Sequence, residues 1–281
     1  MHGVQIESVR NMNNFFNPTR FARLMYAHWA EKRREYVWFF AVLAMLDLIF
    51  MAIFFGTGHH VLRSQFLLSG QVLWYMTGLF FSGLIFAGRY FKYLLNPGAS
   101  LIALMRPASV FEKWLMAFLV ISVLYPLAYT LLYMLLNYPA VMLAKAAVTM
   151  STCETCTYDF RFYFPFLTTD VINDGAGNMR SIMNEQMLFF MTLSAAQAFI
   201  AGGTAYFKRS PVLRTLLVLF LLFIFSIWTE TAPQLGILAS TSDEIVHYST
   251  MEYLLSLGLW LGLPVLLWAA LYFFIKEREV A

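Results

Sequence analysis

The first candidate for a functional side chain in this sequence is a carboxylate in an apolar segment. Asp47 lies between Leu46 and Leu48, well inside a long apolar run. An acid at membrane depth is costly and usually faces a helix bundle, a partner or water. Two interpretations therefore stand side by side. Asp47 either contributes to a polar pathway or subunit contact, or is a protonated, hydrogen-bonded side chain with no further role.

Gln71 and Glu230 place further polar groups in or beside other apolar runs. Most polar groups in such helices hold neighbouring helices together. Together with Asp47, these two residues are the candidates for a pathway or a subunit interface.

Cys153 and Cys156 are the two cysteines of the chain, and they lie in its longest polar connection. A redox-active pair would need the start of a helix in a βαβ unit, and a zinc site would need further Cys or His at ligand spacing. Neither pattern is present. We expect a small structural disulfide and no metal site.

Several catalytic motifs are missing from the sequence. It contains no Gly-x-x-x-x-Gly-Lys-Ser/Thr phosphate loop, no His-Glu-x-x-His zinc motif and no Gly-x-Ser-x-Gly elbow. We therefore expect no enzymatic activity and no cofactor in this chain alone.

The elements that must position these residues are membrane helices. The chain is 60% hydrophobic and 12% charged, far from the balance of a soluble domain. An α-helix needs about twenty apolar residues to cross a bilayer. The sequence predicts an all-α membrane protein with six such spans, at residues 36–55, 66–88, 114–137, 186–207, 213–229 and 253–275.

Basic residues predict the orientation of these spans. Of the 19 Lys and Arg residues, 15 fall in the N-terminal segment, the second and fourth connections and the C-terminal tail. The positive-inside rule puts both termini in the cytoplasm and the segment at 138–185 outside. The basic residues follow the membrane borders rather than one folded face, which argues against nucleic-acid binding.

The N-terminal segment, residues 1–35, includes an amphipathic stretch. Phe21, Leu24, Met25 and Trp29 recur at helical spacing among several basic residues. Pro18 suits the first turn of a helix, with Asn17 or Thr19 as its cap. We expect an interfacial helix on anionic lipids; the alternative is a cytoplasmic extension of the first span.

The second connection, residues 89–113 of the membrane domain at 36–281, contains two helix breaks. Asn96-Pro97-Gly98 is a turn signal, and a short apolar piece at 99–105 follows it. Ser109 and Glu112 have the spacing of a capping box, so the third span should begin at Ser109. A short apolar helix at this surface needs something to cover it.

Two local sequences resemble the membrane subunits of bacterial ABC-2-type exporters. Residues 14–21, NFFNPTRF, are similar to the opening of such subunits. Residues 104–114, LMRPASVFEKW, are similar to their Leu-Pro-Ala-Ser-x-x-Glu-Lys segment, with Arg106 where many have Leu. The six spans and the cytoplasmic termini agree with the same class.

The resemblance implies a bacterial inner-membrane complex. Two membrane subunits, identical or different, would join two cytoplasmic ATP-binding-cassette ATPase subunits that bind ATP and Mg²⁺. Residues 99–113 would form the coupling helix that docks on the ATPase. Its contact residues would be Leu104, Arg106, Ser109, Glu112 and Lys113.

A different class of protein fits the same helix plan. A scaffold, immunity or sensor subunit would keep six spans and need no ATPase. Association with a nucleotide-binding subunit distinguishes the two classes, whereas the fold alone does not fix function or substrate.

Overall fold

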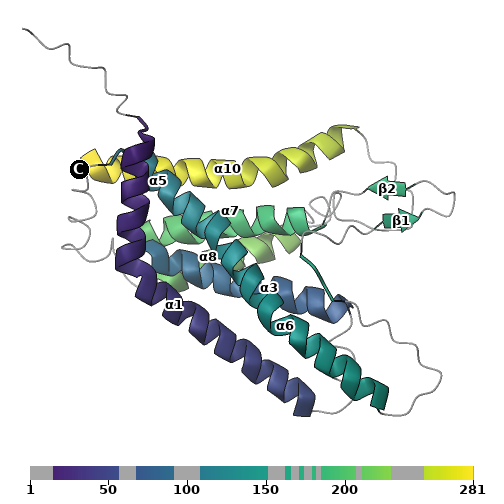
Figure 1. The fold of residues 1–281 in the computed structure, drawn as a ribbon. Coiled ribbons are helices and arrows are strands. Elements are labelled where there is room, and N and C mark those ends of the chain that lie inside the picture. The colour runs from purple at the N-terminus through teal and green to yellow at the C-terminus, as the bar shows by residue number, and fades with distance from the viewer. Residues whose placement is uncertain are drawn as a thin grey trace, which may run out of the picture.

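Six helices make up the described part of the chain (Figure 1). The computed structural model describes residues 15–56, 68–91, 108–150, 162–165, 171–173, 179–181, 185–206, 211–228 and 250–280. The helices are α1 (Pro18–Gly56), α3 (Leu68–Tyr90), a continuous third rod of α5 (Val110–Phe118), η2 (Leu119–Leu124) and α6 (Tyr125–Met150), α7 (Glu185–Tyr206), α8 (Pro211–Trp228) and α10 (Thr250–Val280).

Four of these helices are long and apolar enough to cross a membrane. They contain the segments Pro18–Gly56, Gly70–Tyr90, Val110–Ala146 and Trp260–Glu277. These four helices suggest a multi-pass membrane protein, as the composition predicted. Helices α7 and α8 lie where the fourth and fifth spans were predicted, and α7 holds a shorter apolar segment, Phe189–Thr204. Their passage through the bilayer stays a prediction.

The predicted interfacial helix is not separate from the first span. Both belong to α1, a single helix of 39 residues, which changes direction along its length (Figure 1). His28 Nε2 and Tyr36 OH share a hydrogen bond of 2.6 Å, although eight residues rise about 12 Å in a straight helix. This bond links the amphipathic part of α1 to the start of the predicted first span.

The third rod is longer than predicted. The third span was predicted to end at residue 137, but α6 continues to Met150, so the first part of the predicted external segment at 138–185 is helical. The rod also contains a π-helical turn, η2, in which the N–H of Tyr125 bonds to the carbonyl of Val120. Pro126 follows directly and has no N–H to bond to Ser122, so the regular α pattern fails at this point.

Helix α7 is the centre of the bundle. It packs against α10, α3 and α8, while α1 packs mainly against α6. At Gly203 of α7, an added Cβ would collide with the side chain of Thr215 on α8. Gly83 of α3 also leaves little space for a side chain, because an added Cβ would lie 3.0 Å from Gln197 Nε2. Small residues thus let the helices approach closely.

A small β-hairpin departs from the all-α prediction. Strands β1 (Val171–Asn173) and β2 (Met179–Ser181) pair antiparallel, with Ile172 opposite Arg180. They flank residues 174–178, which lie outside the described residues. Figure 1 places the hairpin at the opposite end of the bundle from the start of α1, the start of α5 and the end of α10. The end with the start of α1, the start of α5 and the end of α10 is the one predicted to face the cytoplasm.

Candidate functional site

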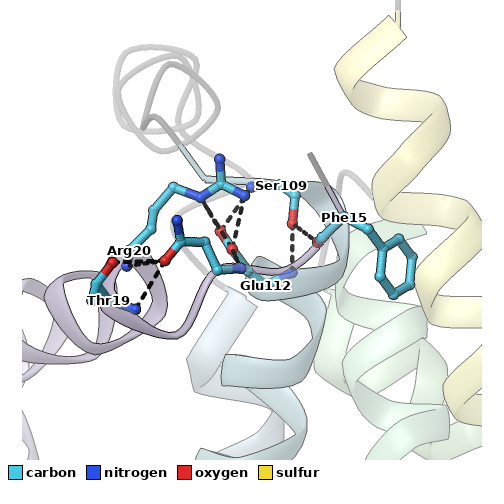
Figure 2. Close-up of polar contacts among 6 residues, drawn as sticks. Phe15, Thr19, Arg20, Ser109 and Glu112 are labelled. Carbon is cyan, nitrogen blue, oxygen red and sulfur yellow. Dashed lines mark hydrogen bonds and ion pairs between the residues drawn. The ribbon is translucent and has the colours of Figure 1, made fainter. Parts of the chain in front are cut away.

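Two segments distant in sequence meet where the third rod begins (Figure 2). Arg20 Nε lies 2.8 Å from Glu112 Oε2 and 3.0 Å from Oε1, and Arg20 Nη2 lies 2.8 Å from Oε1. A guanidinium that binds both oxygens of one carboxylate makes one of the stronger ion pairs in proteins. We call the group of Asn17, Arg20, Ser109 and Glu112 the clamp.

The Glu112 carboxylate also caps the helix to which it belongs. Ser109 Oγ accepts a hydrogen bond from the N–H of Glu112 at 3.2 Å, and Glu112 Oε2 accepts one from the N–H of Ser109 at 3.0 Å. This is the capping box that the sequence predicted, and α5 begins directly after Ser109. The predicted start of the third span is confirmed.

The N-terminal segment has a cap of its own in the same place. Asn17 Oδ1 accepts hydrogen bonds from the N–H groups of Thr19 and Arg20, at 3.0 and 3.4 Å, with Pro18 in the first turn. The N–H of Asn17 in turn donates to Glu112 Oε1 at 2.8 Å. One carboxylate therefore holds both helix starts together.

Aromatic rings and a hydroxyl complete the contact. Ser109 Oγ donates to the carbonyl of Phe15 at 2.6 Å, a bond visible in Figure 2. The ring of Phe15 stacks on Phe111 with centroids 4.5 Å apart, and Phe16 lies edge-on to Phe111 at 6.1 Å. The segment ahead of α1 is thus fixed over the start of α5.

Glu112 is fully buried, whereas the Arg20 side chain is 29% exposed. Burial opposes ionisation, but Arg20 supplies a counter-charge and the N–H groups of Asn17 and Ser109 donate to the two carboxylate oxygens. Both oxygens are therefore bound within the chain itself.

The remaining predicted coupling residues are only partly described. Lys113 is half-buried one residue after Glu112, and its backbone N–H donates to the carbonyl of Ser109 at 3.1 Å. Leu104 and Arg106 lie outside the described residues, as does the predicted short helix at 99–105. Glu230, Cys153 and Cys156 also lie outside them, so the disulfide stays a prediction.

The two described pathway candidates bind different partners. Asp47 Oδ1 accepts a hydrogen bond from Trp74 Nε1 at 2.8 Å. Gln71 is buried, and its Oε1 accepts hydrogen bonds from Asn137 Nδ2 at 3.2 Å and from the backbone N–H of Tyr163 at 3.0 Å. Gln71 therefore links α3, α6 and the segment at 162–165, as most polar residues in membrane helices do.

This link gives a direct prediction. Replacing Gln71 with Leu should raise amide hydrogen exchange at Tyr163 by about tenfold or more, because a buried N–H then loses its acceptor. Exchange measured by mass spectrometry in detergent would show it. Thr77→Ala is the control, since Thr77 lies on the exposed face of the same helix and bonds to Leu73 of its own helix. Unchanged exchange at Tyr163 in Gln71→Leu would contradict the assignment.

The contact between Arg20 and Glu112 was not predicted from the sequence. Arg20 is one of the basic residues of the predicted amphipathic stretch, and Glu112 belongs to the predicted capping box. The available signal was that both residues belong to the two segments that resemble one family.

The fold and the clamp together describe a helical membrane protein whose N-terminal segment is bonded to the start of its third rod. No protein-family model, curated protein or solved structure matches the chain.

Proposed function

We propose that this chain is the membrane subunit of an ABC-2-type exporter in the bacterial inner membrane. It would pair with a second membrane subunit and work with separate cytoplasmic ATPase subunits, which bind ATP and Mg²⁺. The observation that carries the proposal is the clamp. The two segments that resemble this class, 14–21 and 104–114, lie in contact through Arg20 and Glu112.

The clamp suits a protein that receives force at its cytoplasmic surface. The proposed docking segment, residues 99–113, contains the N-terminal cap at Ser109. Glu112 bonds both to that cap and to the start of α1. Because the carboxylate is buried, Glu112 would pass movement from the docking segment to α1 and the third rod rather than touch the ATPase itself.

Purification from the native cell tests the proposal. The tagged full-length chain, extracted in mild detergent, should retain a protein with a Gly-x-x-x-x-Gly-Lys-Ser/Thr motif and ATP hydrolysis that vanadate inhibits. Mass spectrometry and an ATPase assay give the two measurements. Absence of any such ATPase would favour the alternative, a scaffold, immunity or sensor protein of the membrane.

Variants of the docking segment make the same test specific. Leu104→Asp or Arg106→Glu should reduce the retained ATPase several-fold while the chain still inserts into the membrane. Lys208→Glu and Arg209→Glu, in the fourth connection, change charge on the same predicted side of the membrane and should have little effect. Equal ATPase retention in all four variants would contradict docking at 99–113.

A further inference from the structure

Among the described residues, Asp47 is an acid inside a predicted span without a counter-charge. Asp47 is half-buried in α1 and bonds to the indole N–H of Trp74. Within the described residues it forms no ion pair. It lies eleven residues after the predicted cytoplasmic start of the first span, or about 16 Å along the helix, near mid-bilayer.

The predicted spans offer no cation at that depth. The six predicted spans contain no Lys or His, and the one Arg they contain, Arg214, lies in the first turn of the fifth span at its predicted cytoplasmic end. A second copy packed alongside would bring the same spans and the same absence. Because an uncompensated acid costs about 2.5–3.5 kcal/mol at the centre of a membrane helix, a proton or a cation from outside the chain must neutralise it.

The surroundings of Asp47 are aromatic. Phe50 and Phe54 lie one and two turns further along the same face of α1. Both pack edge-on against the ring of Trp74, with centroids 5.1 and 5.8 Å away. On the side of α1 that carries Phe50, next to Asp47, the surface is apolar and open: Phe50 is 43% exposed and Leu46 is 46% exposed. A ligand that reaches Asp47 from the bilayer would therefore meet hydrocarbon and aromatic rings before the carboxylate.

We propose that Asp47, Trp74, Phe50 and Phe54 form a binding site for a lipophilic organic cation that enters from the bilayer. The carboxylate supplies the charge, and the aromatic rings attract a cation while tolerating its apolar substituents. Such a ligand would bring its own hydrophobic surface into the membrane and remove the cost of the isolated acid. That this ligand class is the exported substrate rests on the proposed function; the binding itself does not.

Saturation binding of radiolabelled tetraphenylphosphonium to the full chain in lipid nanodiscs tests the site. We expect saturable binding with one cation per chain, weakened on the order of tenfold or more by Asp47→Asn. Asp47→Glu should restore most of the affinity because it restores the charge. Trp74→Ala should weaken binding, whereas Trp74→Phe, which keeps a ring, should weaken it less. Trp38→Ala is the control, since Trp38 is an exposed tryptophan elsewhere on α1.

Two results would overturn the proposal. One is the absence of saturable binding to the parent chain. The other is equal affinity in the parent and Asp47→Asn, which would mean that a proton alone neutralises Asp47. If Asp47→Asn does not fold, Trp74→Ala decides the question: an affinity like that of Trp38→Ala would overturn the site. The measurement uses no ATPase, so its failure is distinct from failure to find an ATPase partner.

Discussion

Replacing Glu112 with Ala is expected to lower the thermal unfolding temperature of the detergent-purified chain by on the order of 5 °C or more. The change removes the acceptor for Arg20 and for the N–H groups of Asn17 and Ser109 in one step. Buried donors left without an acceptor account for most of the cost. Thermal unfolding followed by tryptophan fluorescence would measure the shift.

A graded series makes the Glu112 prediction specific. Glu112→Gln should lie between the parent and Glu112→Ala, because Gln also serves in a capping box but has no charge for Arg20. Glu35→Ala is the matched control. Glu35 pairs with Lys32 at 2.8 Å, but the two side chains are 62% and 31% exposed, and such surface pairs contribute little. An equal shift in Glu112→Ala and Glu35→Ala would show that the clamp does not stabilise the fold.

Gly203→Ala is expected to destabilise the contact between α7 and α8 by about 1–3 kcal/mol. The new Cβ would lie 2.8 Å from Thr215 Cβ and would also meet Oγ1 and Cγ2 of that side chain. Thr215 is only 1% exposed, so it has little room to move. Gly203→Leu should prevent correct packing altogether. Unfolding in detergent, together with the yield of monodisperse protein, provides the measurement.

The neighbouring glycine supplies the control for Gly203. An added Cβ at Gly202 meets nothing within 4 Å, so Gly202→Ala should be neutral or slightly stabilising through its higher helix propensity. Combining Gly203→Ala with Thr215→Gly should recover part of the loss, because it removes all three colliding atoms. If Gly202→Ala and Gly203→Ala behave alike, the close approach of α7 and α8 is wrong.

Local patterns predicted much of the fold. The described helices begin and end within about five residues of four of the six predicted spans, because bilayer thickness sets the length of an apolar run. The capping box of Ser109 and Glu112 was equally readable, since it depends only on residues three apart. Asn17 was one of two predicted caps for α1, and the structure selects it.

Contacts between distant residues were not predictable in this way. Arg20 and Glu112 are 92 residues apart, and no sequence pattern around either residue predicts that they are in contact. The length of α6 was missed for a related reason. Asn137 and Pro139 are typical of a helix end, but Asn137 is buried and donates to Gln71 and Tyr133. The three-residue strands β1 and β2 are too short to show an alternating pattern.

The distance in sequence between Arg20 and Glu112 also determines when the clamp can form during biosynthesis. At 5–20 residues per second, a ribosome needs roughly 5 to 18 s to proceed from Arg20 to Glu112. During that interval, the first span leaves the translation machinery with no partner for Arg20. Its orientation must then come from its own flanking cations and the bilayer. The ion pair between Arg20 and Glu112 can form only afterwards, when the orientation of the first span is already fixed.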